Sequence, residues 1–231
     1  MIYLIWGTIR PQIFKETYKY WMDRANYPDK IINKVVVKTE EQKAELKGFD
    51  VTVVKENGYT YGIYQITKNL ELEDTDIILL PTDDTYCPNR WDKYLYKKFT
   101  NWDGALYLED GQNDINRELD NTLAMPLMFM VMACMTFKCL KQLNKCIFSP
   151  HYYHFFSDVE ALHNLYDLGL IKDDRKIDNK LFHHKHYYEG LRKKDASDES
   201  HYGNPWYHDH DMLYERMKLP VEERLRTITN E

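Results

Sequence analysis

The sequence has few cysteines and no long hydrophobic run, and both shortages exclude classes of protein. Its four cysteines form no C-x-x-C pair, so we expect free thiols in a reducing compartment and neither a disulfide framework nor a structural zinc site. The longest apolar stretch, Leu123 to Phe137, contains Pro126 and is shorter than the roughly 20 residues that a membrane-spanning helix needs. This stretch is therefore predicted to be part of the core.

The sequence also has no excess of positive charge, and we expect no secretory signal peptide at its N-terminus. The net charge is −6, which argues against a generally basic nucleic-acid binder, although a local basic patch is still compatible with it. The first apolar segment, Met1 to Trp6, is too short for the hydrophobic region of a secretory signal. We expect a cytoplasmic protein whose residues 1–231 form a single domain.

Apolar runs alternate with helical patterns along the first half of the chain. Strands alternating with helices predict an α/β fold with a mostly parallel sheet that is covered on both faces. The second half, 111–231, has a less regular pattern. Strands are predicted at 2–6, 34–37, 51–54, 76–80, 105–108 and 127–131, and helices at 12–25, 39–47, 62–69, 91–99, 136–143 and 157–168 (with Ser157 as N-cap). The tail from Ala196 shows no strong periodicity until Asp211 to Lys218.

Two adjacent carboxylates, Asp83 and Asp84, follow the apolar run that ends at Leu80. The carboxyl end of a buried strand is where open α/β sheets bind ligands. Two neighbouring carboxylates repel each other, and a cation relieves that repulsion. Mg²⁺ and Mn²⁺ prefer carboxylate oxygens and often bridge to substrate phosphates. The pair therefore indicates a metal-assisted, nucleotide-handling site, and the alternative is a solvated turn.

Histidines and further acids occur in the second half. A His-x-His pair on a strand places His184 and His186 on the same face, where one of them could complete a metal site that begins at Asp84. The alternative is a solvated loop. Asp158 and Glu160 lie at the predicted start of a helix, where acids favour the helix dipole. One of them could instead act as a general base.

Taken in order, several segments resemble the GT-A-fold glycosyltransferases of the family-2-like type, especially small phage and bacterial members. Thr8-Ile9-Arg10-Pro11 looks like the start of the nucleotide-binding region, and Thr82-Asp83-Asp84, with Pro88 and Trp91-Asp92, looks like a DxD-type metal site. Ser149 to Tyr152 with Asp158-Val159-Glu160 looks like the acceptor-side motif with its catalytic acid, Phe182 to His186 looks like the late His-x-His, and the regions around Asp195, Tyr202 and Asp211 to Arg216 follow. The sequence departs from the family's pattern in one respect, because no third acid follows the aspartate pair.

The resemblance implies a Rossmann-type sandwich with a nucleotide-sugar-binding half (1–110) and an irregular acceptor-side half (111–231). It implies a metal-dependent transfer of a sugar, from a UDP-sugar or another nucleotide-diphosphate sugar, to a hydroxyl acceptor with inversion. Mn²⁺ or Mg²⁺ would be the cofactor. By this resemblance Asp158 is the base and Glu160 orients it or the acceptor, Thr8, Arg10, Pro11 and Asp83 bind the donor, and Asp84, Asp83, His184 and His186 hold the metal.

Three other functions compete with a saccharide glycosyltransferase. A phage enzyme in the host cytoplasm could glycosylate hydroxymethylated pyrimidine bases of DNA, because Lys185 to Lys194 combines basic residues with two tyrosines. The net charge of −6 disfavours this acceptor. A nucleotidyltransferase could use the same aspartate pair. A catalytically silent nucleotide- or glycan-binding module could retain the fold without any turnover.

Overall fold

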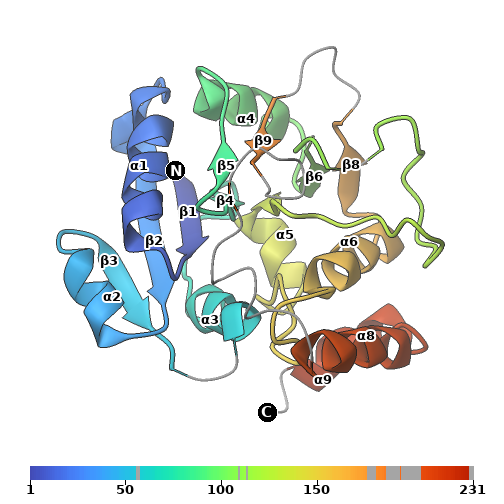
Figure 1. Ribbon diagram of the computed structural model, residues 1–231. Helices are drawn as coiled ribbons and strands as arrows, with labels where there is room; N and C mark the ends of the chain where they lie inside the picture. Colours follow the sequence, from blue (N-terminus) through green and yellow to red (C-terminus); the bar gives the residue numbers. More distant parts are fainter. Residues whose placement is uncertain are drawn as a thin grey trace.

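A seven-stranded, mostly parallel sheet organises the described part of the computed structural model (Figure 1), which comprises residues 1–55, 58–108, 110–112, 114–175, 181–185, 193 and 204–228. Its strand order is β3-β2-β1-β4-β7-β6-β8. Only β7 runs against its two neighbours, β4 and β6. The strands are β1 (Ile2–Gly7), β2 (Ile31–Val37), β3 (Asp50–Val53), β4 (Ile77–Leu79), β6 (Ala105–Tyr107), β7 (Cys134–Thr136) and β8 (Ile171–Asp173).

Helices cover both faces of the sheet, as the alternating pattern predicts. The core on one face contains side chains of α1 (Pro11–Asp23) and α4 (Trp91–Phe99), and α2 (Glu40–Glu45) precedes β3 at the sheet edge. The core on the other face contains side chains of four helices. These are α3 (Gly58–Thr67), α5 (Phe137–Gln142), α6 (Ser157–Asp167) and α9 (Val221–Ile228); α8 (Asn204–Arg216) packs outside them against α6.

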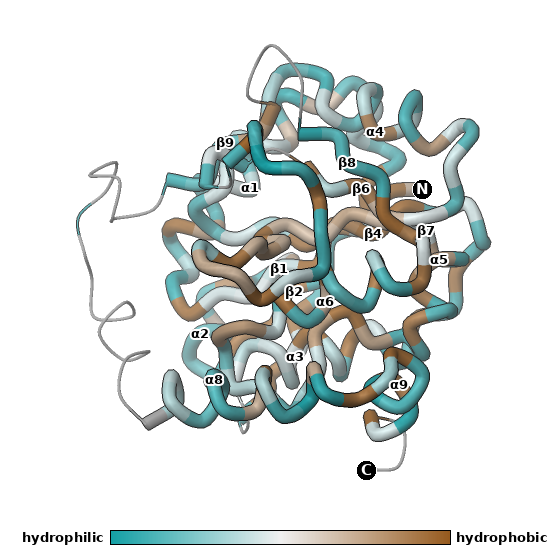
Figure 2. The backbone as a smooth tube through the Cα atoms, turned by 90° about the vertical axis from the view of Figure 1, so that its right-hand side faces the viewer, coloured by the Kyte–Doolittle hydropathy of each residue, from teal (hydrophilic) through white to brown (hydrophobic). Residues whose placement is uncertain are grey.

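The side chains of β1 point alternately to the two faces of the sheet and so contribute to both cores. Ile2, Leu4 and Trp6 enter the core under α1 and α4, whereas Ile5 enters the core under α3. Successive side chains of a strand point to opposite faces, so an apolar run such as that of β1 suits a strand that is covered on both sides. Figure 2 shows this arrangement as hydrophobic colour along the central strands and hydrophilic colour on the outer turns.

The capping box predicted at the start of α2 is confirmed. Thr39 Oγ1 accepts the backbone N–H of Gln42, and the Gln42 side chain accepts the N–H of Thr39 in return. At α6 the prediction is wrong by one residue. Phe156, with φ of 61°, is the N-cap, and Ser157 is already the first helical residue.

The second half of the chain shows the largest differences from the predicted elements. Residues 127–131 are not a strand, and the strand that joins the sheet is β7, a few residues later. Of the predicted core stretch Leu123 to Phe137, Met125 is exposed, while most residues after Met128 are buried. Sequence reasoning missed β8, α9 and the first turns of α8. Within the described residues, none of the helices combines the length and apolar character needed to cross a bilayer.

Candidate active site

The Asp83-Asp84 pair lies in a tight turn directly after β4. The turn closes through a hydrogen bond from the Thr85 backbone N–H to the Thr82 carbonyl (3.1 Å). Helix α1 holds it from one side, because Thr17 Oγ1 donates to the Asp83 carbonyl (2.6 Å) and Trp21 Nε1 to the Thr85 carbonyl (2.7 Å). Both carboxylates are therefore presented at the carboxyl end of the sheet, as the sequence predicted.

The carboxylate of Asp83 is bound by the loop between β1 and α1. Its Oδ2 accepts hydrogen bonds from Thr8 Oγ1 (2.6 Å) and Arg10 Nε (3.1 Å), and its Oδ1 pairs with Arg10 Nη2. Burial raises the pKa of Asp83 above its ordinary value, and Arg10 offsets part of that increase. Asp83 thus fixes the Thr8–Arg10 loop beside the aspartate turn.

The carboxylate of Asp84 faces His184, which comes from a segment one hundred residues later in the chain. The two are brought together by a small antiparallel sheet of β5 (Thr85–Tyr86) and β9 (His183–His184), visible side by side in Figure 1. Asp84 Oδ1 lies 2.9 Å from His184 Nε2 and accepts from Thr82 Oγ1, and Oδ2 lies 3.2 Å from Arg10 Nη2. Burial raises the pKa of Asp84, but His184 and Arg10 outweigh burial and hold it well below the usual range.

Asp84 and His184 are the described residues that could hold a divalent cation of the Mn²⁺ or Mg²⁺ type. A carboxylate oxygen and an imidazole nitrogen are both suitable ligands, and here they meet at one point of the cavity wall. Among the described residues, no three His, Cys, Asp or Glu side chains gather closely enough to hold a metal by themselves. His186 lies outside the described residues.

Asp158 lines the same cavity and lies in the first turn of α6. Its Oδ1 accepts the backbone N–H of Val159 (3.0 Å). Burial raises the pKa of Asp158 to about 6, and the nearby charge of Asp110 adds to the increase. A carboxylate with a pKa in this range is a better proton acceptor near neutral pH than an ordinary aspartate.

Glu160 is also at the start of α6 but lies outside this cavity, as the described residues define it. It is 1% exposed and forms a bidentate ion pair with Arg216 of α8, with both N–O distances 2.7 Å. Tyr152 Oη donates to Glu160 Oε2 (2.6 Å). The structure therefore places Glu160 in the packing between α6 and α8 and does not bring it to Asp158's side of the helix.

Replacing Arg216 by methionine is expected to destabilise the protein by about 3–5 kcal/mol, because Glu160 would keep a buried charge without its partner. Denaturant unfolding measures the change. Lys218→Ala is the control, since it removes an exposed ion pair with Glu215 and should cost less than about 1 kcal/mol. Equal losses in the two variants would contradict the assignment.

The aspartate pair Asp83-Asp84 and the carboxylate of Asp158 line one cavity of about 550 Å³. It is bordered by the ends of β1 and β2, the start of α3, the aspartate turn and the loop before α6. Pro11 is buried at the first position of α1 and lies outside the lining. Six of the residues singled out in the sequence contribute to its wall: Thr8, Arg10, Asp83, Asp84, Asp158 and His184.

Sequence reasoning missed three residues that shape this cavity. Asp110 follows β6 as Asp83 follows β4, so the same strand-then-acid signal could have found it; its carbonyl accepts the N–H of His184 (2.9 Å). Asp209 of α8 is fully buried and accepts three consecutive backbone N–H groups of the loop 153–155, each at 2.9 Å. Nothing in the local sequence pointed to it. The third residue, Tyr59, follows the Asn57-Gly58 turn signal.

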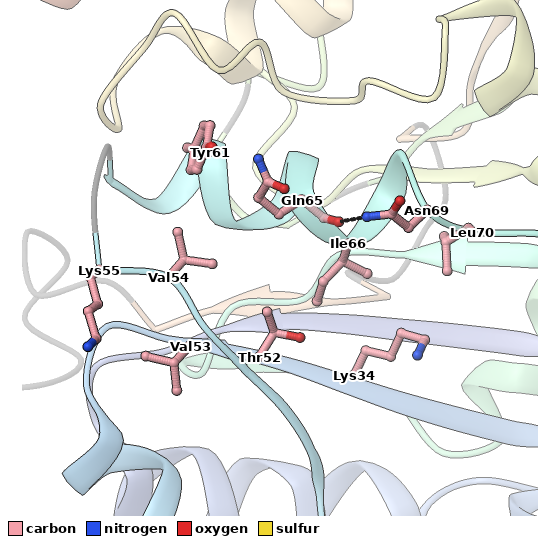
Figure 3. A pocket seen from close by; sticks show the side chains of 10 residues that line it. All are labelled: Lys34, Thr52, Val53, Val54, Lys55, Tyr61, Gln65, Ile66, Asn69 and Leu70. Carbon is pink, nitrogen blue, oxygen red and sulfur yellow. Dashed lines mark hydrogen bonds between the residues drawn. The ribbon is translucent and has the colours of Figure 1, made fainter.

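Another cavity, also about 550 Å³, opens at the sheet edge between β3 and α3 (Figure 3). Lys34 and Lys55 lie on its wall with mostly apolar and amide side chains, and none of the described residues of its lining is a carboxylate. Lys34 Nζ already pairs with Asp50 Oδ2 (2.7 Å). The chemistry expected from the sequence is therefore concentrated in the cavity that contains the aspartates.

Comparison with solved structures identifies the fold. The chain is similar to the mannosyltransferase PcManGT from Pyrobaculum calidifontis in complex with GDP-Man and Mn²⁺, with a TM-score of 0.57 and 15% identity over 99% of this chain and 73% of that one. The chain is also similar to S. aureus TarS 1-349 in complex with UDP-GlcNAc, with a TM-score of 0.63 and 12% identity over 96% of this chain and 69% of that one. A 4-diphosphocytidyl-2C-methyl-D-erythritol synthase from Anaerococcus prevotii matches with a TM-score of 0.52 and 10% identity over 92% of this chain and 96% of that one.

These likenesses show that the chain has a GT-A-type glycosyltransferase fold. No protein-family model and no curated protein matches the sequence. At identities of 10–15%, these similarities show that the fold is shared, but they do not show that the activity is shared. The expected fold class, a GT-A-like sandwich with a mostly parallel central sheet, is therefore confirmed, and the function has to be argued from the site.

Proposed function

We propose that this protein is a metal-dependent glycosyltransferase that moves a sugar from a nucleotide-diphosphate sugar to a hydroxyl acceptor. One observation carries the proposal: a single cavity is lined by Asp84 and His184, a carboxylate and an imidazole 2.9 Å apart, and by Asp158, a carboxylate of raised pKa. The fold supports it, since PcManGT and TarS were solved with GDP-Man and UDP-GlcNAc. We propose a UDP-sugar as the first donor to test.

In this reaction each of the lining residues would have a separate role. Asp84 and His184 would hold the cation, which when bound stabilises the negative charge that develops on the departing diphosphate. Thr8 and Arg10, fixed by Asp83, border the cavity beside it and would bind the nucleotide portion. Asp158 would take the proton of the acceptor hydroxyl as that oxygen attacks the sugar carbon. Direct attack by the acceptor inverts the configuration at that carbon.

We propose a saccharide as the acceptor. Tyr153 lines the cavity and is 44% exposed. Trp206 and His210 of α8, stacked with their ring centroids 5.2 Å apart, both pack against Phe156, which also lines the cavity. Flat amphipathic rings suit the faces of sugars. Most of the basic stretch 185–194, on which a DNA acceptor depends, lies outside the described residues.

Adding a matching nucleotide sugar with Mn²⁺ is expected to raise the melting temperature. A donor at 100 times its Kd stabilises the native state by about 2.7 kcal/mol, which corresponds to roughly 5–11 °C for a domain of this size. The measurement is a thermal-shift series with UDP-GlcNAc, GDP-mannose and other nucleotide sugars, with Mn²⁺ or EDTA.

Turnover separates the competing functions. A glycosyltransferase should release the nucleoside diphosphate and free sugar slowly when water replaces the acceptor. A binding module would show the thermal shift without turnover, and a nucleotidyltransferase would release pyrophosphate from a nucleoside triphosphate. No shift with any nucleotide sugar would contradict the proposal.

A further inference from the structure

Asp209 of α8 binds the loop 153–155 through its carboxylate. Oδ1 accepts the backbone N–H of Tyr153, and Oδ2 accepts those of His154 and Phe155, each at 2.9 Å. Three consecutive N–H groups that point at one anion fix the conformation of the backbone that carries them. Hydrogen bonds to an ionised acceptor are also stronger than neutral ones, so this carboxylate is a firm anchor for the loop.

Burial makes Asp209 dependent on this loop. The residue is fully buried, and its remaining hydrogen-bond partner among the described residues is the adjacent His208, whose Nδ1 lies 3.0 Å from Oδ1. A buried carboxylate is costly unless hydrogen bonds satisfy its charge. The N–H groups of the loop supply most of these bonds, so the charge of Asp209 favours the one loop conformation that presents all three.

The loop is the first part of a continuous stretch of cavity wall. All six residues 153–158 line the cavity, and the last of them is Asp158. The loop is also held by α3, because the Tyr153 carbonyl accepts the N–H of Tyr59 (3.2 Å). Its N–H groups are thus bound by α8 and one of its carbonyls by α3, which leaves the wall little freedom to move before Asp158.

Phe156 joins the loop to α6 in a conformation that needs support. Its φ of 61° is unfavourable for a residue other than glycine and persists only where the surroundings determine it. Its ring packs against Trp206 and His210 of α8, with centroid distances of 5.6 and 5.8 Å. Its carbonyl accepts the N–H of Glu160 (3.0 Å) in the first turn of α6. Helix α8 therefore supports the point at which α6 begins, two residues before Asp158.

We propose that Asp209 is a positioning residue for the transfer reaction. By holding the loop 153–155 it sets where α6 begins, and thereby where the carboxylate of Asp158 meets the acceptor hydroxyl. This inference rests on the proposed function, in which Asp158 is the base. A displacement of a reacting group by about 1 Å can lower a rate roughly 10²-fold, so this anchor matters although Asp209 lies outside the cavity lining.

The test is Asp209→Asn, which keeps the shape of the side chain. One carboxylate oxygen becomes an NH₂ group, which cannot accept from the N–H groups of the loop. We measure kcat of diphosphate release from UDP-GlcNAc, or from GDP-mannose if that sugar gives the larger thermal shift, and the Kd of the same donor by calorimetry with Mn²⁺. The kcat should fall roughly 10- to 100-fold. The Kd should be unchanged, because Thr8 and Arg10, the residues proposed to bind the nucleotide, are fixed by Asp83.

The pH profile separates positioning from a general loss of structure. Burial raises the pKa of Asp158 to about 6, and the charge of Asp110 adds to the increase, so kcat/KM of the wild type should decrease below that pH. When the start of α6 is no longer held, water reaches Asp158 and its pKa falls toward the ordinary value. In Asp209→Asn the decrease should therefore begin at a lower pH. Partial unfolding would lower the rate at every pH without moving this point.

Asp211→Asn is the matched control. Asp211 lies two residues further along α8, is exposed, and has its carboxylate 3.2 Å from Nδ1 of the adjacent His210, so it resembles Asp209 in all but the bonds to the loop. This variant should keep the kcat, the donor Kd and the pH profile of the wild type. If Asp209→Asn does not fold, Asp209→Glu replaces it, since glutamate keeps the charge and moves both oxygens by one methylene. It should also lower kcat at unchanged donor Kd.

Two results would overturn the assignment while leaving the proposed function intact. One is a kcat or a pH profile of Asp209→Asn, or of the glutamate variant in its place, that stays as in the wild type. The other is a loss of donor affinity as large as the loss of kcat, which would make Asp209 a residue that supports the fold in general. A wild-type protein that binds no nucleotide sugar would contradict the proposed function itself, and the assignment with it.

Discussion

Asp84→Ala is expected to lower sugar transfer by roughly 10³-fold, because a bound cation stabilises the departing diphosphate by several kcal/mol and the variant loses a carboxylate that would hold it. The residue lies in a turn after β4, and its side chain contacts Thr82, Arg10 and His184 at the cavity wall. Its loss should therefore leave the sheet intact. The measurement is the rate of UDP release from the donor identified by thermal shift, with circular dichroism as the check on folding.

Asp103→Ala is the control for this variant. Asp103 is an exposed aspartate whose ion-pair partner is Lys138, and it lies outside the cavity, so its removal should not change the rate. EDTA should reduce the wild-type rate as the Asp84 variant does, and Mn²⁺ should restore only the wild type. Full wild-type activity in EDTA, or a normal rate for Asp84→Ala, would contradict the metal assignment.

Asp158→Asn is expected to lower transfer by about 10²–10⁴-fold, the usual contribution of a general base. Asparagine keeps the shape of the side chain but cannot accept the proton, so the Kd of the donor should be unchanged. Burial penalises the charged form of Asp158 and raises its pKa to about 6. The neutral asparagine should therefore not destabilise the protein.

The pH profile gives a second measure of the same residue. The base acts as a carboxylate, so kcat/KM of the wild type should be constant above pH 6 and fall about tenfold per pH unit below it. The kcat/KM of Asp158→Asn should no longer show this decrease below pH 6, which we call the acidic limb. Asp167→Asn, at the other end of α6 and paired with Arg224, should keep both the rate and the limb. A near-native rate for Asp158→Asn would leave it as a carboxylate that only stabilises the helix start.

Elements with a strong local signal were predicted, whereas the short strands outside an apolar run were not. The apolar runs of β1, β2 and β4 identify strands because a strand covered on both faces needs hydrophobic side chains on both. The strands β5, β8 and β9 have two or three residues each and contain no apolar run, so neither hydrophobicity nor a period identifies them. The run at 127–131 resembled a strand in composition, but the sheet instead takes in β7 between β4 and β6.

Helical geometry could have shown that Asp158 and Glu160 point in different directions. Residues two apart on a helix differ by about 200° in direction, so Asp158 and Glu160 cannot both face one cavity. The sequence could not say which of them does. Packing decides it, since Arg216 and Tyr152 lie on the α8 side of α6 and bind Glu160 there.

The sequence by itself determined the α/β class, the mostly parallel sheet and the placement of Asp83-Asp84 at a strand end, because each follows from local periodicity and from where parallel strands present their carboxyl ends. Only the tertiary structure decided that Asp84 meets His184 from one hundred residues away, and that the ring of Tyr59 packs over Gly7 with its hydroxyl buried. Such contacts depend on how β5 pairs with β9 and how a ring packs over Gly7. These are long-range arrangements, on which local sequence patterns carry no information.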